Sequence, residues 1–282
     1  GKRRCFIQGG VHMFGKLIKY DFKSLLKVHI GMYLFMLVES FALLLSELLR
    51  KNYPDNVFSK MFGGLLIVMF IITAIVVFIV SNVMCILRYR KNVLKDEGYL
   101  THTLPVESWQ IHASKLVVSV LYSYITAVVV YLLASLAMLN IGWGADFYIL
   151  INGEMVLEGM TAFMPALMVC LLISPIAFYC QVFMCLCLGY RMSGNKDVMS
   201  FVVYIVMNVV TQILSFGLIM IASIAQLGGS IFSPEVLEME MTEAPVLYMN
   251  IVMGGSVVMS ILLATVCYLL SVGTLKKKLS LE

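Results

Sequence analysis

The stretch FGGLLIVMFIITAIVVFIVSNVMCIL, residues Phe62–Leu87, decides the fold of this chain because it contains no Asp, Glu, Lys or Arg. A helix of about 20 residues crosses the ~30 Å hydrocarbon layer of a bilayer, so this run is long enough to span a membrane. The whole chain shares this character: 61% of its residues are hydrophobic, 13% are charged and its mean hydropathy is +0.96. Soluble domains are about 45–50% apolar. The composition therefore predicts an integral membrane protein.

Five further apolar runs of spanning length lie before and after Phe62–Leu87, which is the second of six in chain order. They are Ile30–Leu49, Leu116–Ile141, Thr161–Gly189, Val198–Leu227 and Leu247–Leu275. Such long uninterrupted runs are typical of transmembrane helices. We therefore expect an all-α integral membrane protein with a six-helix transmembrane domain over residues 30–282.

Lysine and arginine are distributed unevenly between the connecting segments. They are most numerous in the N-terminal arm and the second connection, and they also occur in the fourth connection and the C-terminal tail. The first connection holds Arg50, Lys51 and Lys60, whereas Gly142–Met160 and Gly228–Val246 contain no Lys or Arg. By the positive-inside rule, both termini and the second and fourth connections are cytoplasmic. The net charge of +4 follows from this topology, and we expect no nucleic-acid partner.

The sequence indicates no metal, cofactor or catalytic site. None of the seven cysteines falls in a predicted outer connection, which argues against a disulfide framework. Cys185 and Cys187 have no His or carboxylate nearby to complete a metal site. The stretch from Gly10 to Lys16 resembles a phosphate-binding loop, but Leu17 stands where that loop needs Ser or Thr. We expect a chain that is not itself an enzyme.

The N-terminal arm divides into two predicted parts. Residues 1–12, GKRRCFIQGGVH, are expected to be a translated leader or a disordered tail. Residues 13–29 place apolar side chains on one helical face and lysines on the other: Lys16, Lys19, Lys23 and Lys27. This pattern predicts an amphipathic helix in the inner membrane interface, with a solvated entry to the first span as the alternative. Asp21 lies within the apolar face, so we expect it to pair with a basic group of the helical bundle or of the second connection.

The second connection is the longest polar stretch, residues 88–115, RYRKNVLKDEGYLTHTLPVESWQIHASK. Lys91–Leu100 can form a short helix, and Pro105 disfavours a helical residue before it. Glu107 and Ser108 then offer a cap for a new helix that continues into the third span. Trp109 fits the aromatic belt of the interface. The layout suits a coupling element, although a solvated loop would have a similar charge pattern.

Two stretches resemble a known family. MFGKLIKYDFKSLLK at Met13–Lys27 and KDEGYLTHTLPVESWQIHASKL at Lys95–Leu116 resemble the permease subunits of type-two ATP-binding-cassette exporters of Gram-positive bacteria. The resemblance implies a bacterial plasma-membrane protein that couples ATP hydrolysis to export. It also implies a separate ATPase subunit that binds ATP and Mg²⁺, and a second permease subunit that is the same or a different chain. It further implies a coupling helix within about Asn92–Thr103 that docks in a groove of the ATPase subunit. The residues that we predict to carry the coupling are Asp96, Glu97, Gly98, Tyr99, Leu100 and Pro105.

Polar residues inside the predicted spans are few. Glu39 lies near the middle of the first span, and an ionisable group at that depth is a functional hypothesis by default. Asn208 and Gln212 share one face of the fifth span at a spacing of four residues. We take these three as candidates for a translocation path, although hydrogen bonds between helices would also explain the two amides.

Two other functional classes stay open on the sequence. A secondary transporter or channel would explain Glu39, but it would normally contain more intramembrane carboxylates or matched broken helices. A non-transporting scaffold or sensor would use the acidic outer connections as its binding surface. The cargo of an exporter, whether peptide, drug-like or lipid-like, does not follow from the sequence.

Overall fold

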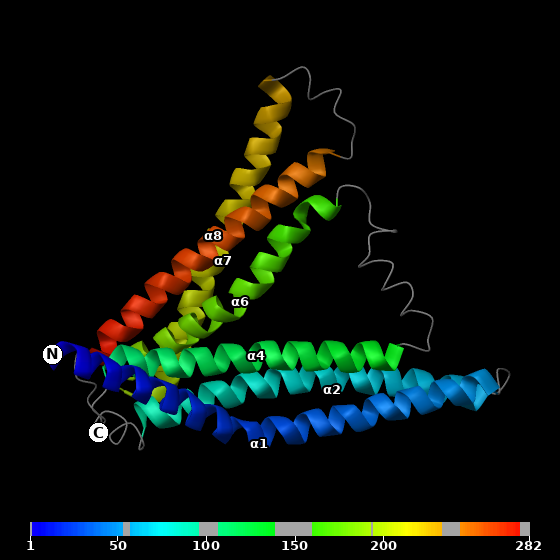
Figure 1. Ribbon diagram of the computed structural model, residues 1–282. Coiled ribbons are helices and arrows are strands. Elements are labelled where there is room, and N and C mark those ends of the chain that lie inside the picture. The colour runs from blue at the N-terminus through cyan, green and yellow to red at the C-terminus, as the bar shows by residue number, and fades with distance from the viewer. Residues whose placement is uncertain are drawn as a thin grey trace. The chain divides into compact units, whose positions relative to one another are not determined.

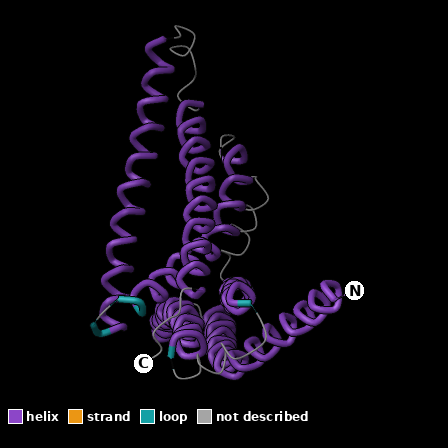
Figure 2. Tube along the Cα trace, turned by 90° about the vertical axis from the view of Figure 1, so that its left-hand side faces the viewer, coloured by secondary structure: helices purple, strands orange, loops and turns teal. Residues whose placement is uncertain are grey.

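The computed structural model describes residues 2–52, 57–95, 107–138, 160–192, 194–232 and 243–276, and these residues are almost entirely helical. Figure 1 shows the elements, which in chain order are α1 (Lys2–Asn52), α2 (Val57–Tyr89), the π-helical turn η1 (Arg90–Leu94), α4 (Ser108–Met138), α6 (Met160–Gly189), α7 (Lys196–Phe232) and α8 (Glu243–Lys276). Within the described ranges there is no strand (Figure 2). Six of these helices are long and apolar enough to cross a membrane, as the sequence predicted.

The outer surfaces of the helices are apolar. Phe35, Leu45, Ile72, Phe201 and Leu269 are each more than half exposed. Water would make such a continuous apolar surface unfavourable, whereas lipid chains accommodate it without cost. The exposed side chains therefore support a multi-pass membrane protein.

The chain packs as two compact units, which we describe separately. Unit 1 comprises Gly1–Tyr89 and Ala113–Glu154, and unit 2 comprises Arg90–His112 and Met155–Glu282. The polar connection between α2 and α4 therefore belongs to the unit that contains α6, α7 and α8. This grouping separates the connection from α2 and from most of α4, although both are its direct continuations in sequence.

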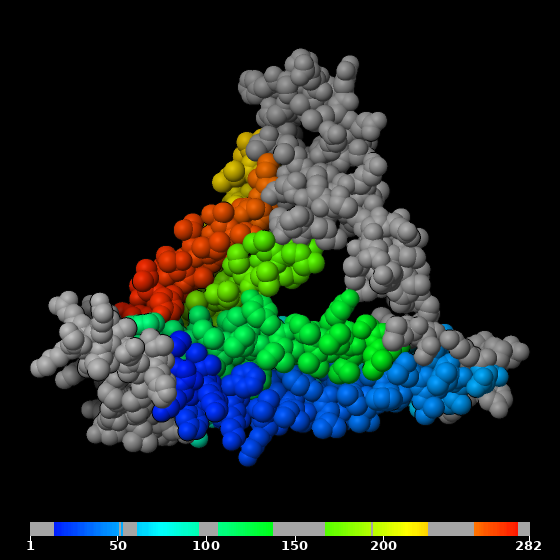
Figure 3. Space-filling view, in the orientation of Figure 1, coloured from blue at the N-terminus to red at the C-terminus, as the bar shows by residue number. Residues whose placement is uncertain are grey.

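Unit 1 is a three-helix bundle of α1, α2 and α4. Its core contains side chains from all three helices: Met36, Leu43, Phe70, Val77, Leu133 and Ala137. The buried Ser40 hydroxyl of α1 donates to the Leu133 carbonyl oxygen of α4 at 3.1 Å, so the two helices approach closely. Their side chains form a continuous surface in the space-filling view (Figure 3).

Helix α1 runs without a break through the segments that the sequence separated at residues 12 and 29. The backbone of residues 2–12 is helical, where a disordered tail was one of two expectations. Extending an existing helix adds one hydrogen bond for each residue that is ordered, which favours this continuation. Within residues 14–29, Leu25 and His29 are buried, Val28 is exposed and all four lysines are exposed.

In unit 2, α6 packs against both α7 and α8. The end of α6 and the start of α7 come very close at Gly189, where an added Cβ would overlap the Ser200 backbone. Between them, Gly194 has a φ of 119°, a conformation that L-residues with a side chain rarely adopt. These two glycines allow the short connection that leads from α6 into α7.

Candidate coupling site

The residues predicted to contact an ATPase lie outside the described part of the chain. They are Asp96, Glu97, Gly98, Tyr99, Leu100 and Pro105. The segments on either side are described: η1 with Lys95 before the stretch, and Glu107 with the first turns of α4 after it. We call these segments the first and second stems, and the site is built from them.

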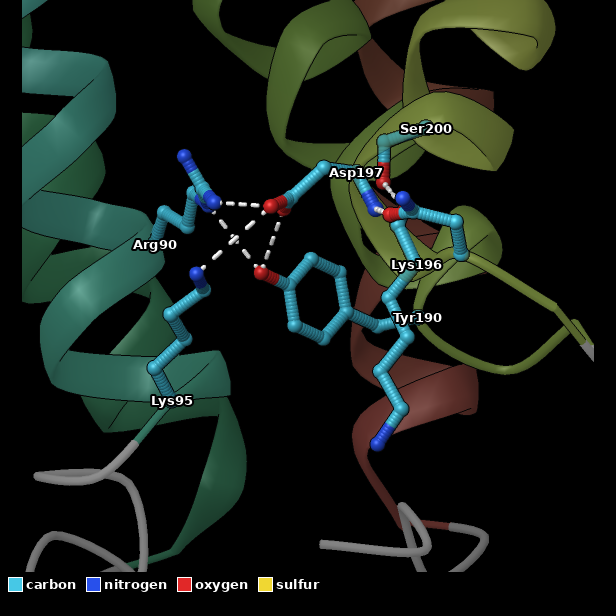
Figure 4. Close-up of polar contacts among 7 residues, drawn as sticks. Arg90, Lys95, Tyr190, Lys196, Asp197 and Ser200 are labelled. Carbon is cyan, nitrogen blue, oxygen red and sulfur yellow. Dashed lines mark hydrogen bonds and ion pairs between the residues drawn. The ribbon is translucent and has the colours of Figure 1, made fainter. Parts of the chain in front are cut away.

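Side chains of the first stem meet the α6–α7 connection in a polar cluster, which we call the Asp197 cluster: Arg90, Lys95, Tyr190 and Asp197 (Figure 4). Arg90 donates from Nη2 to Oδ2 of Asp197, and from Nε to the Tyr190 hydroxyl at 3.0 Å. The Tyr190 hydroxyl donates to Oδ1 of Asp197 at 2.8 Å. Lys95 Nζ lies 3.5 Å from Oδ2 of Asp197, so one carboxylate holds two cations of the stem.

Local sequence explains why Asp197 stands at this place. Asn195 caps α7, because its carbonyl oxygen accepts the Met199 amide at 3.0 Å and its Oδ1 accepts the Asp197 amide at 3.3 Å. Asp197 falls in the first turn of α7, where a carboxylate is favoured by the helix dipole. The cap and the dipole together fix a negative charge at the start of α7.

The Asp197 cluster combines charged side chains that reach the surface with a buried phenol, that of Tyr190. Burial raises the pKa of Tyr190 above its usual value, an effect that the hydrogen bond from Arg90 partly opposes. Tyr190 therefore stays protonated and can donate to Asp197 while it accepts from Arg90. The Asp197 side chain is 45% exposed and that of Lys95 is 42% exposed, so each ion pair alone adds little stability. The cluster is better suited to orienting the stem than to stabilising the fold.

The second stem begins with the helix cap that the sequence predicted. The Glu107 carbonyl oxygen accepts the Gln110 amide at 2.9 Å, and the Glu107 amide donates back to Oε1 of Gln110 at 3.3 Å. The Trp109 indole N–H donates to the Glu107 carboxylate, so the side chain of the capping residue is also hydrogen-bonded. This reciprocal arrangement fixes the first residue of α4.

One turn further, the second stem is held by aromatic contacts. His112 is fully buried, with its ring centroid 5.9 Å from that of Phe183 on α6 and 5.2 Å from that of Tyr268 on α8. Such offset and edge-to-face contacts add about 0.5–1.5 kcal/mol beyond the area they bury. Both stems of the coupling stretch are thus attached to helices of unit 2.

The structure assigns the candidate path residues to different units. Glu39 lies in unit 1, where Oε1 of its carboxylate accepts a hydrogen bond from the Thr73 hydroxyl at 3.0 Å. In unit 2, the Asn208 amide donates to the Tyr204 carbonyl oxygen of its own helix at 2.9 Å, and Gln212 is exposed. The Asn208 amide therefore makes one of its hydrogen bonds within its own helix.

The predicted interfacial residues are exposed. They are Lys16, Lys19, Lys23, Lys27 and Trp109. Asp21, on the opposite face of α1 from these lysines, pairs with Lys115 of α4. Lys115 belongs to the polar connection, so the predicted pairing of Asp21 with a basic group is confirmed.

Sequence reasoning missed a buried polar network in unit 1. His29 Nε2 lies 2.9 Å from the Ser81 hydroxyl, and that hydroxyl lies 3.0 Å from the Thr126 hydroxyl. The Tyr33 hydroxyl lies 2.7 Å from the same Thr126 oxygen. The sequence did contain a signal for this network, because polar side chains such as His and Thr within apolar runs need hydrogen-bond partners on neighbouring helices. The Asp197 cluster was also missed, since its partners lie about a hundred positions apart in the sequence.

Across the described ranges, no group of three or more His, Cys, Asp or Glu side chains is arranged to hold a metal ion. The charged and polar side chains of the stems form ion pairs and hydrogen bonds with other protein groups. Comparison of the chain with models of protein families, with curated proteins and with solved structures gives no match.

Proposed function

We propose that this chain is the membrane-spanning permease subunit of an ATP-driven exporter similar to the type-two ATP-binding-cassette exporters. It would work with a separate ATPase subunit and with a second permease subunit, of the same or a different sequence, in a bacterial plasma membrane. The proposal draws on the resemblance of Met13–Lys27 and Lys95–Leu116 to that family. The observation that carries it is the attachment of both stems to unit 2.

A coupling element has to pass a displacement from a soluble ATPase to membrane helices without losing it in a flexible loop. On the first stem, Arg90 and Lys95 converge on Asp197 at the start of α7. On the second stem, His112 packs between Phe183 and Tyr268. A force applied between the stems would therefore act on α6, α7 and α8 as well as on α2 and α4. An ordinary solvated loop would not need either attachment.

The proposed orientation follows from charge. The described basic residues of the stems, of the α6–α7 connection and of the α1 polar face would all lie on the cytoplasmic side, with both termini. The four exposed lysines of α1 would then face the anionic headgroups of the inner leaflet. Each lysine near such a surface contributes about 1 kcal/mol of attraction.

The test is cargo-stimulated ATP hydrolysis by the complex, purified with the ATPase encoded in the neighbouring reading frame. We expect the double variant Tyr99→Ala, Leu100→Ala to lower the stimulated rate at least about tenfold, because two interface anchors can each contribute about 2 kcal/mol. The membrane content of the variant should stay unchanged. The matched control is Tyr20→Ala, Leu34→Ala, since both side chains are exposed and lie far from the stems in sequence.

Wild-type coupling in the double variant, with the complex intact, would contradict the proposal and make the connection a plain loop. Cargo transport by the chain in the absence of any ATPase would instead favour a secondary transporter. Failure of every ATPase to copurify, together with absence of transport, would favour a scaffold or sensor.

A further inference from the structure

Unit 1 contains an apolar groove of about 420 Å³ between α1 and α2. Gly31, Met32 and Phe35 line it from α1, and Thr73, Val76 and Val80 line it from α2. Pockets for drug-sized ligands measure about 300–1,000 Å³ and are mostly apolar with a few polar groups, so the groove has a suitable size and lining. Phe35 and Val76 are about half exposed, which leaves the groove accessible from the side of the lipid.

Gly31 keeps this groove open. An added Cβ at Gly31 would meet no atom within 4 Å, so neighbouring side chains do not occupy the space beside it. A larger side chain at this position would extend into the groove without forcing the two helices apart. The position can therefore be used to fill the groove selectively.

The groove has a carboxylate next to it. Gly31, Phe35 and Glu39 follow one another at intervals of four residues, which places them along one side of α1. Thr73, which lines the groove, donates its hydroxyl to Oε1 of Glu39 at 3.0 Å. The other oxygen, Oε2, is buried and has no hydrogen-bond partner among the described residues. A buried acceptor without a donor is unfavourable, and more so when it carries charge.

The charge of Glu39 selects the chemistry of the occupant. In the described part of the chain no Lys, Arg or His forms an ion pair with Glu39. A lipid acyl chain would fill the groove but offer no polar group to the carboxylate beside it, and an anionic amphiphile would be repelled. A protonated amine attached to an apolar body would satisfy both parts of the site.

We propose that the groove between α1 and α2 binds lipophilic amines, with the apolar body against Phe35 and Val76 and the ammonium group at Thr73, beside the Glu39 carboxylate that adjoins the groove. As a binding site it requires only unit 1 and no ATPase. As the entry point for exported cargo it rests on the proposed function. Binding and export are therefore measured separately.

The binding experiment uses radiolabelled propranolol, an aromatic secondary amine, with the purified full chain in detergent. Naproxen, an aromatic carboxylate of similar size, is the ligand control. Glu39→Gln should weaken propranolol binding about tenfold or more, because it removes a charge-assisted hydrogen bond. Glu47→Gln is the matched control, since Glu47 is on the same helix but pairs with Arg50 at 2.6 Å. It should leave binding unchanged.

A second variant tests the groove independently of Glu39. Gly31→Leu should abolish saturable binding while the protein stays folded, and Gly217→Leu, at another glycine with open space around it, should not. Three results would overturn the proposal: no saturable binding by the wild-type chain, equal binding of naproxen, or loss of binding in Gly31→Leu but not in Glu39→Gln. The last result would indicate an apolar groove that takes lipid chains. Saturable binding without ATP-dependent export of the amine would leave the site intact and contradict only its role in transport.

Discussion

At the scale of single residues, the strongest electrostatic constraint is the buried pair of Asp21 and Lys115. Asp21 is 5% exposed and Lys115 is 6% exposed, and their ion pair joins α1 to α4 within unit 1. The second carboxylate oxygen of Asp21 has no hydrogen-bond partner among the described residues, so the pair is not fully compensated. Removing ions from water costs several kcal/mol each, and a pair with an unsatisfied oxygen recovers only part of that cost.

We therefore predict that Lys115→Met destabilises the chain by about 3–5 kcal/mol, because it leaves the Asp21 carboxylate buried without a cation. The double variant Asp21→Leu, Lys115→Met should regain most of that loss. Thermal unfolding of the purified single and double variants in detergent measures both effects. Additive losses in the double variant would mean that the two side chains do not interact.

The Asp197 cluster leads to a different expectation, since Asp197 and Lys95 are exposed and Arg90 is partly exposed. Asp197→Asn should change stability by less than about 1 kcal/mol. It should nevertheless lower cargo-stimulated ATP hydrolysis, because Arg90 and Lys95 would no longer hold the first stem on α7. The control is Arg191→Gln, which removes an exposed charge from the same α6–α7 connection but outside the cluster. Unchanged cargo-stimulated ATP hydrolysis in Asp197→Asn would show that the ion pairs between the first stem and α7 are not needed for coupling.

At the scale of elements, the junction of α6 and α7 depends on the absence of a side chain at Gly189. The Ser200 backbone lies where the Cβ of any other residue would stand, and Ser200 is itself held by a hydrogen bond from its hydroxyl to the Lys196 carbonyl oxygen at 2.8 Å. The close approach keeps the α6–α7 connection short. It thereby keeps Tyr190 and Asp197 within hydrogen-bond distance of each other.

Gly189→Ala should therefore destabilise the chain by about 1–3 kcal/mol, the usual cost of overpacking. Gly217→Ala, within α7, meets no atom within 4 Å and should be neutral or stabilising by up to about 1 kcal/mol, because alanine favours helix more than glycine does. The melting temperatures of the two purified variants provide the comparison. Equal melting temperatures would mean that the helices separate there without cost.

At the scale of the whole molecule, two properties combine: six apolar helices of spanning length among the described residues, and an asymmetric distribution of lysine and arginine along the sequence. The exposed apolar surfaces favour a hydrocarbon environment over water. Segments rich in lysine and arginine tend to stay on the cytoplasmic side of the membrane, because they are not easily translocated across it. Together these properties support a single orientation in the membrane.

The orientation can be tested with single cysteines introduced into a chain whose native cysteines are replaced by alanine. A cysteine at Lys196 should react with an impermeant maleimide only after the membrane is permeabilised. A cysteine at Glu238, in an acidic segment without Lys or Arg, should react in intact cells. The reverse pattern would invert the topology and remove the stems from the cytoplasm.

The sequence by itself indicated a membrane protein, the approximate positions of the six apolar helices that the structure describes and the cap at the start of the helix that begins at Ser108. These properties depend on composition and on neighbours a few residues apart, which a single chain displays directly. It also indicated that Asp21 needs a cation, because a carboxylate on an apolar face is unfavourable without one.

Only the tertiary structure decided which partners meet. Lys115 as the cation of Asp21, the convergence of Arg90, Lys95 and Tyr190 on Asp197, and the packing of His112 on Phe183 and Tyr268 all join distant parts of the sequence. The apolar face of a transmembrane helix does not distinguish a lipid neighbour from a helix neighbour, because both are equally apolar. Packing and a few polar contacts make that choice, and they exist only once the helices have assembled.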